Sequence, residues 1–343
     1  MQATLSRKIT GPIKYSLNGF SLSAYIAKML MPLALIIAIC LTAPGISTGT
    51  EITDYKNVFK PYHAKDGSLK IAIREFVDGA DAKALSVDPM TFETTVTDAK
   101  VTLKASASRA WKNTPFALSL VRYTAPDGRL QNSGIRKGES RVDGVFLTVD
   151  LCPSRKPLDK ALFEATVERF KKEKTPAPVA IAVSGLWMDR HPEDLRWLMN
   201  KGASGELAIT WINHTETHPY HGDRPLEEDF LLSVGVDFEK EVLANEVEML
   251  KNGIRPTVFF RFPGLVSDNG LLKRLRTLSL IPVGTDAWLA KKEVPGRGSI
   301  ILVHGNGNEP EGVEALMELY KRQLADGKNG LRLLPMREAF GRR

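Results

Sequence analysis

The feature that most constrains the fold is an alternation of short apolar runs with amphipathic stretches, which begins near residue 141. Apolar, β-branched runs of this length are typical of buried strands. They occupy residues 145–150, 179–184, 207–212, 257–262, 280–283, 299–303 and 331–334. The amphipathic stretches predict helices at 159–172, from Pro192 onward, at 237–252 and at 310–324. Because strands separated by helices pair in parallel, the sequence predicts an α/β domain with a barrel of seven strand–helix units.

The region before this domain, residues 48–140, is polar and punctuated by turn residues. Alternation of apolar and polar residues at 99–103 and again at 116–120 predicts two strands there. We therefore expect a small β-rich region packed on the barrel, without an assigned role. The expected domains are residues 1–47, 48–140 and 141–343.

The first 47 residues have the pattern of an export signal. Four basic residues and no acidic one precede or flank an apolar run at 29–43, which ends in Pro44-Gly45. The run is short for the roughly 20 residues of a membrane-spanning helix, although residues 25–27 could lengthen it. We expect an exported protein, periplasmic or extracellular, and an uncleaved inner-membrane anchor is the alternative.

Composition argues against nucleic acid as a partner. The formal charge is +7, and the four basic residues of the first 47 leave +3 for the remaining chain. The densest later basic runs, at 171–174 and 291–293, each contain an acidic residue, so both are interpreted as solvated faces. Two cysteines cannot form a disulfide framework or a four-cysteine zinc site. The oligomeric state is not indicated.

Unusual polar and aromatic residues cluster where the predicted strands end. The carboxyl ends of parallel strands meet at one edge, where barrel enzymes carry their reactive groups. Taken singly, each residue has a structural explanation as a cap, an ion-pair partner or part of the core. Their repetition at successive strand ends predicts a functional site. These residues are Asp150, His214, His218, Arg261, Asp286, Trp288 and His304.

The order and spacing of these residues resemble the five motifs of the polysaccharide deacetylases, the NodB-homology family. The resemblance covers about residues 141–340. The motifs are Thr148-Val-Asp150, His214-Thr-Glu-Thr-His218-Pro219, Arg261-Phe-Pro263-Gly264, Asp286-Ala-Trp288 and Ile301-Leu-Val-His304.

The resemblance implies a distorted (β/α)7 barrel and a hydrolase acting on carbon–nitrogen bonds, which removes acyl groups from N-acylated sugars of a cell-wall or exopolysaccharide glycan. It implies a divalent metal, often zinc, bound by His214 and His218. It also implies that Asp150 is the general base and His304 the general acid. Arg261 would orient Asp150, and Asp286 would orient His304. Trp288 would line the acyl pocket. A backbone N–H near Gly264 could stabilise the oxyanion.

The first motif departs from the family pattern. The family usually has Thr-Phe-Asp-Asp-Gly-Pro, whose second Asp is the third metal ligand, whereas this chain has Leu151 at that position, followed by Cys152-Pro153. Leucine cannot coordinate a metal, and two histidines alone make a weak site. We favour His221 as the replacement ligand. The alternatives are Asp223, Glu216, Cys152, or a site with weak or no metal binding.

Two other functions remain open. One is a metal-independent C–N hydrolase of the same fold. The other is a non-catalytic glycan-binding or assembly protein, suggested by Leu151 and by the N-terminal region of residues 48–140.

Overall fold

The computed structural model describes residues 51–103, 109–139, 142–171, 174–325 and 332–341. Residues 49–343 form one compact unit. The predicted export segment lies outside the described residues, so its role stays a prediction. Within the described ranges, no helix has both the length and the apolar character needed to cross a membrane.

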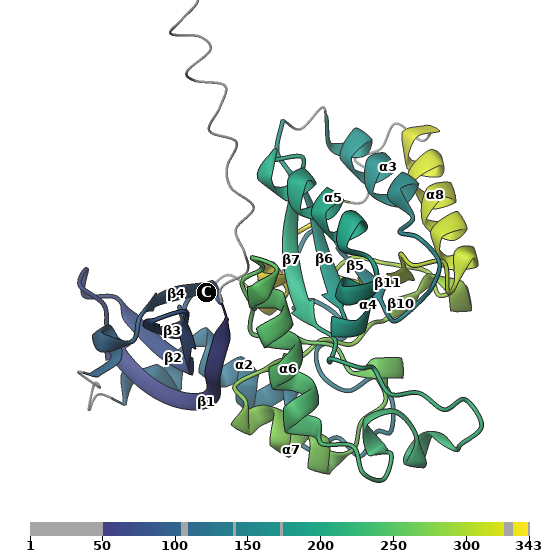
Figure 1. Cartoon of the computed structure of the whole chain (residues 1–343). Coiled ribbons are helices and arrows are strands. Elements are labelled where there is room, and N and C mark those ends of the chain that lie inside the picture. Colours follow the sequence, from purple (N-terminus) through teal and green to yellow (C-terminus); the bar gives the residue numbers. More distant parts are fainter. Residues whose placement is uncertain (1–50, 104–108, 140–141, 172–173, 326–331, 342–343) are drawn as a thin grey trace, which may run out of the picture. The chain divides into compact units, whose positions relative to one another are not determined.

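The core of the fold is a sheet of seven strands in the order β10-β11-β5-β6-β7-β8-β9. All six strand pairings are parallel. The sheet curls into a half-barrel (Figure 1), which confirms the predicted α/β barrel-like fold. The strands are β5 (Phe146–Leu151), β6 (Ala177–Val183), β7 (Leu207–Asn213), β8 (Phe259–Phe260), β9 (Ile281–Pro282), β10 (Ala287–Trp288) and β11 (Ile300–His304).

The two faces of this sheet pack against different partners. Helices α3 (Lys160–Phe170), α5 (Pro192–Ala203) and α8 (Pro310–Ala325) lie side by side on its convex face (Figure 1). Leu147, Val149 and Leu151 of β5 belong to the apolar cluster under these helices. Side chains alternate between the faces of a strand, so Phe146 and Asp150 point to the concave side. Phe146 indeed packs in a separate cluster there.

The predicted helices are all present, and side-chain caps mark the starts of two of them. Asp159 accepts a hydrogen bond from the Leu162 N–H at the start of α3. Asp237 does the same for two N–H groups at the start of α6 (Phe238–Lys251). Such caps satisfy N–H groups that have no partner within the helix. Three further helices, α2 (Pro115–Tyr123), α4 (Gly185–Arg190) and α7 (Asn269–Thr277), were not predicted.

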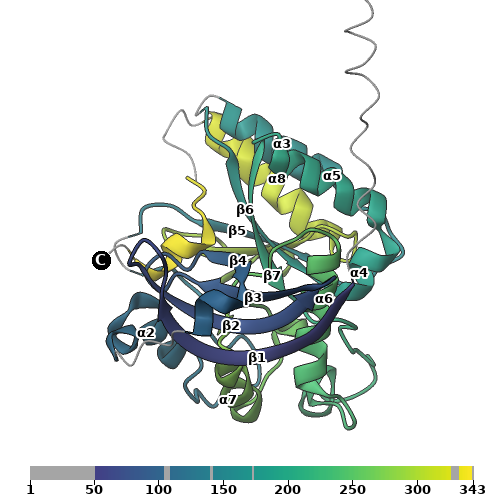
Figure 2. The same ribbon diagram turned by 60° about the vertical axis from the view of Figure 1, so that its left-hand side comes forward.

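Residues 52–98 form an antiparallel four-stranded sheet in the order β1-β2-β3-β4 (Figure 2). Its strands are β1 (Ile52–His63), β2 (Leu69–Asp78), β3 (Asp81–Val87) and β4 (Thr94–Asp98). Ile71 and Leu85 share one apolar cluster with Ala182 of β6 and Ile212 of β7. The small sheet therefore packs on the concave side of the large one, although the proposed domain boundaries themselves stay a prediction.

Both strands predicted in the N-terminal region are wrong. Residues 99–103 form a 3-10 helix, η1 (Ala99–Leu103), and residues 116–120 lie in α2 (Pro115–Tyr123). In α2, Phe116, Ala117 and Leu120 are buried with helical spacing, whereas Leu118, which completed the apparent alternation, is exposed. The overlooked signal is Thr114-Pro115, because threonine at the N-cap and proline at the next position favour a helix start.

The last predicted strand, 331–334, is also wrong. In its described part, Leu333 forms an isolated bridge with Val145, and the seventh strand of the sheet is instead β10. The remaining 3-10 helices lie in connections. They are η2 (Ala110–Asn113), η4 (Leu226–Glu228), η5 (Phe230–Leu232), η6 (Pro263–Leu265), η7 (Leu289–Lys291) and η8 (Met336–Phe340).

Candidate active site and metal centre

Four of the predicted site residues meet at the carboxyl edge of the parallel sheet. Asp150 on β5 and His304 on β11 are register partners on adjacent strands. His214 directly follows β7, and Arg261 directly follows β8. The parallel pairing of these strands explains why residues far apart in the sequence converge.

Arg261 is fully buried and contacts two other members of the site. Its Nη1 lies 3.3 Å from Asp150 Oδ1, and its Nη2 donates a 2.9 Å hydrogen bond to Thr148 Oγ1. Its backbone carbonyl lies 2.9 Å from His214 Nδ1. The structure thus brings Arg261 to Asp150, as the resemblance implied. It also gives Arg261 a contact with His214 that the sequence did not suggest.

Asp150 keeps part of its carboxylate available. Oδ1 is buried and accepts no hydrogen bond from any described residue, although Arg261 lies within ion-pair distance. Oδ2 is 3.9 Å from His214 Nε2. A carboxylate held by an arginine with one unsatisfied oxygen can accept a proton from a water molecule in the site.

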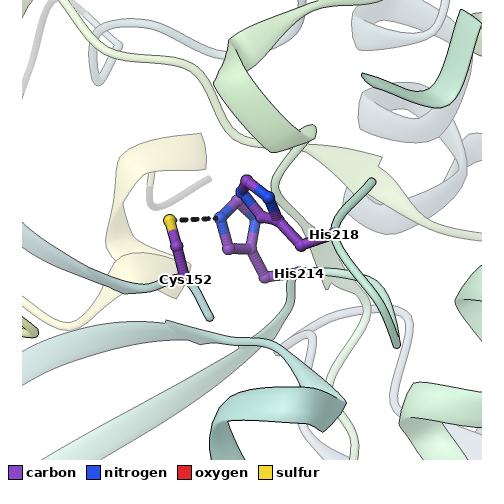
Figure 3. A group of neighbouring side chains, drawn as sticks. All are labelled: Cys152, His214 and His218. Carbon is purple, nitrogen blue, oxygen red and sulfur yellow. Dashed lines mark hydrogen bonds between the residues drawn. The ribbon is translucent and has the colours of Figure 1, made fainter. Parts of the chain in front are cut away.

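His214 and His218 lie together with Cys152 in a compact group (Figure 3). One donor atom of each residue lies within 4.8 Å of the others, and Cys152 Sγ is 3.4 Å from His214 Nε2. His218 Nε2 is buried without a hydrogen-bond partner among the described residues. Positive φ values of 68° at Thr215 and 49° at His218 show that the two histidines are joined by a turn. The absence of helical geometry at His218 is expected, because proline disfavours it in the preceding residue.

The protonation of this group suits metal coordination. Burial lowers the pKa of His214 to about 4, against the opposing effect of Asp150, so its imidazole is neutral near pH 7. With Nδ1 facing the Arg261 carbonyl as donor, Nε2 keeps its lone pair toward Cys152. Burial raises the pKa of Cys152, but its interactions with the neighbouring His218 and His304 outweigh burial and bring that pKa down to about 7.

The altered first motif now has a structural explanation. Leu151 is fully buried in the cluster under the helices of the convex face, so the side chain at the family's ligand position points away from the site. Cys152, one residue later, faces the side of Asp150 and the two histidines. The change in direction between residues 151 and 152 therefore places the thiol in the site.

His221, our favoured third ligand, lies outside this group. Its backbone N–H and its Nδ1 each lie 3.0 Å from Asp229 Oδ1, and 37% of its side chain is exposed. Asp229 is buried, and its hydrogen bonds with residues 221, 222 and 230 hold the loop together. The alternatives Glu216 and Asp223 are likewise absent from the group.

The predicted contact between Asp286 and His304 is wrong. The Asp286 carboxylate accepts hydrogen bonds from Ser299 Oγ and the Ile300 N–H, at the opposite end of β11 from His304. Its place beside His304 is taken by Glu309, whose Oε2 is 2.8 Å from His304 Nδ1. The overlooked signal is an acidic residue five positions after His304, directly before the proline that opens α8.

Glu309 also fixes the position of Trp288. Trp288 Nε1 donates a 2.7 Å hydrogen bond to the same Oε2 atom, and its ring centroid lies 6.2 Å from that of His304. Burial lowers the pKa of His304, but the charge of Cys152 and the bond to Glu309 outweigh it, so that this pKa lies well above its ordinary value. Lining of an acyl pocket by Trp288 stays a prediction.

Gly264 lies beside the turn that joins His214 and His218 rather than in open space. Its φ is 59°, and a Cβ atom there would lie 2.4 Å from the ring of Phe230. The Phe230 ring in turn contacts that of His218, with centroids 6.1 Å apart. Glycine is therefore required by both the backbone conformation and the close approach of the ring. An oxyanion contact of its N–H stays a prediction.

Comparison with protein families gives a match in the N-terminal region. The model of the RP012 protein N-terminal domain matches residues 53–124, which run from β1 to the end of α2.

Comparison with solved structures finds carbohydrate esterases and polysaccharide deacetylases of family 4, the family whose motifs the sequence resembles. A family 4 carbohydrate esterase from Bacillus anthracis is 16% identical, with a TM-score of 0.43 over 62% of this chain and 89% of that one. A chitin deacetylase from Colletotrichum lindemuthianum is 16% identical, with a TM-score of 0.41 over 62% and 93%. A family 4 pseudoenzyme from Bacillus anthracis is 15% identical, with a TM-score of 0.41 over 62% and 70%.

Proposed function

We propose that this protein is an exported hydrolase that removes acyl groups from N-acylated sugars of a cell-wall or exopolysaccharide glycan. The observation that carries the proposal is the pairing of Asp150 and His304 on adjacent strand ends, with the Cys152–His214–His218 group beside Asp150. A base, an acid and a cluster of metal-binding donors are the parts that hydrolysis of an amide requires.

The reaction follows from these positions. Asp150 takes a proton from a water molecule, whose oxygen attacks the carbonyl carbon of the N-acyl group. A divalent metal, zinc in our proposal, would be held by the histidine pair and would polarise the carbonyl. His304 donates a proton to the sugar nitrogen as the C–N bond breaks, which releases a carboxylic acid and a free amine. Arg261 holds Asp150, and Glu309 holds His304.

The substrate class and the location rest on the sequence. The five motifs from Asp150 to His304 support an acylated glycan, and the basic, then apolar, first 47 residues support export, with membrane anchoring through that segment as the alternative. No nucleic acid is proposed as a partner.

The test is release of acetate from N-acetylglucosamine oligomers and peptidoglycan fragments, measured with zinc, cobalt or manganese supplied. We expect release by the wild-type protein and loss with Asp150→Asn. Asp223→Asn is the matched control, because this exposed aspartate lies outside the site and should leave release unchanged. Absence of acetate from the whole panel by metal-loaded protein would refute the proposal.

A second candidate is a glycan-binding protein without catalysis. The observation that favours it is Leu151, which leaves the site without the carboxylate ligand usual in the family. This candidate expects binding to wall fragments that is unaffected by Asp150→Asn or His304→Ala, with no acetate released. A metal-independent hydrolase, the third candidate, would instead keep its activity after exhaustive chelation.

A further inference from the structure

The two histidines of the site need at least one more protein donor for firm metal binding, and the structure offers a thiol. Structural and catalytic zinc sites use three or four protein ligands. We propose that the Cys152 thiolate is the third protein ligand, forming a cysteine–histidine–histidine metal site with His214 and His218. This inference deepens the proposed function and rests on it for the reaction, but its test does not depend on any substrate.

The separations of the donor atoms fit a single ion. Zinc lies about 2.3 Å from a thiolate sulfur and about 2.0–2.1 Å from an imidazole nitrogen, so that tetrahedral neighbours are roughly 3.3–3.6 Å apart. Cys152 Sγ and His214 Nε2 are 3.4 Å apart, and all three donor atoms lie within 4.8 Å of one another. Only small side-chain rotations would bring all three donors onto one ion.

The donor atoms of the two histidines have no hydrogen-bond partner outside this group among the described residues. His218 Nε2 is buried and has no hydrogen-bond partner among the described residues. A buried nitrogen without a partner is costly, and coordination to a metal would remove that cost. His214 Nε2 faces Cys152, because its other ring nitrogen is engaged by the Arg261 carbonyl.

Two of the three ligands are held in place by hydrogen bonds behind them. The buried Asn306 donates a 2.7 Å hydrogen bond to the Cys152 carbonyl, which fixes the backbone that carries the thiol. The 2.9 Å contact of His214 Nδ1 with the Arg261 carbonyl fixes the tautomer and orientation of the imidazole. Such supporting bonds are typical of protein metal sites.

The donor set determines which metals the site prefers. A carboxylate ligand and a thiolate ligand carry the same charge, but the thiolate is softer. Thiolate with imidazole favours zinc and cobalt, whereas magnesium and calcium prefer oxygen donors. Leu151 holds the position of the family's acidic ligand, and the Cys152 thiolate takes over as donor. This exchange narrows the range of metals that the site binds rather than abolishing the site.

The experiment is cobalt reconstitution of the full-length protein after chelation, followed by absorption spectroscopy. We expect one cobalt per chain and a thiolate-to-cobalt charge-transfer band in the near ultraviolet. Cys152→Ala and Cys152→Ser should each lose the band and weaken cobalt binding by more than about 10- to 100-fold, the usual cost of losing a partner behind a ligand. Cys152→Asp should restore tight binding without the band.

His221→Ala is the matched control, since this histidine contacts Asp229 rather than the group, and it should keep both the band and the affinity. Circular dichroism of each variant checks the fold. Cobalt bound without a charge-transfer band, or with unchanged affinity in Cys152→Ala, would overturn the inference, as would failure of the wild-type protein to bind cobalt. A band without acetate release refutes the proposed function alone, and acetate release without a band refutes the thiolate ligand alone.

Discussion

The N-terminal sheet is tied to the large domain by a buried ion pair, whose removal we expect to cost a large part of the stability. Arg74 of β2 and Glu246 of α6 are 0% and 1% exposed. Arg74 Nε and Nη2 donate hydrogen bonds of 2.6 and 2.9 Å to the two oxygens of Glu246. Tyr55 of β1 donates a third, of 2.8 Å, to the same carboxylate.

The perturbation is Glu246→Gln, which keeps the size of the side chain and removes its charge. The Arg74 guanidinium would then remain buried without a counter-charge, although Leu278 and Asn57 still accept hydrogen bonds from it. Removing one partner of a buried ion pair typically costs about 3–5 kcal/mol. That is a large fraction of the roughly 5–15 kcal/mol by which domains are stable.

The assay is urea unfolding at pH 7, followed by tryptophan fluorescence and far-ultraviolet circular dichroism. The matched control is Glu193→Gln, which breaks an exposed pair with Arg196. The side chain of Glu193 is 79% exposed and that of Arg196 is 63% exposed. Exposed pairs contribute about 0–1 kcal/mol, so the control should unfold almost like wild type. A loss below about 1 kcal/mol for Glu246→Gln would refute the reasoning that the pair fastens the N-terminal sheet to α6.

Three further predictions concern single side chains. Glu309→Gln should lower kcat about 10- to 100-fold and reduce the pKa of His304, followed by NMR titration, because the imidazolium loses its anionic partner; an unchanged titration would contradict this role. Gly264→Ala should cost about 1–3 kcal/mol in urea unfolding, because a Cβ at positive φ meets the Phe230 ring, and equal midpoints would count against it. The pKa of Asp88 is lowered in the folded state, since hydrogen bonds outweigh burial, so its stabilisation is present at neutral pH and lost as pH falls through that lowered pKa. Asp88→Asn should therefore cost about 1 kcal/mol at pH 7 and less at pH 3, and a pH-independent difference would exclude this explanation.

The parts of the fold that could be predicted are those set by local patterns. The continuous apolar run that leads to Asp150 predicts a buried strand, and the capped, periodic stretch after Asp237 predicts a helix; the structure contains both. The strand predicted at 116–120 failed because Phe116 and Leu120 are four residues apart, which fits one face of a helix as well as one face of a strand, and Leu118 between them is exposed. Such short stretches are decided by what they pack against, which local patterns do not contain.

In the candidate site, too, some features could be predicted from local sequence patterns and others depended on the path of the folded chain. The convergence of Asp150, His214 and His304 could be predicted because parallel strand ends meet at one edge. The hydrogen-bond partner of His304 could not be predicted in this way. Asp286 and Glu309 are both acidic, and only the path of the chain after β11 brings Glu309 to His304. The third donor depended on which of two successive residues faces the site, a matter of backbone direction at the end of β5.

The position of β5 has a consequence for how the protein is made. β5 is the first strand of the large sheet to be synthesised, yet it lies between β6 and β11, and its Phe146 pairs with Ile300. At 5–20 residues per second, ribosomes need roughly 10–30 s to add the chain between these two residues. During that time one edge of β5 is without its partner and exposed to wrong pairing. Asp150 therefore lacks His304 as its neighbour until β11 pairs with β5, and a nascent chain cannot acquire the complete site before that strand has docked.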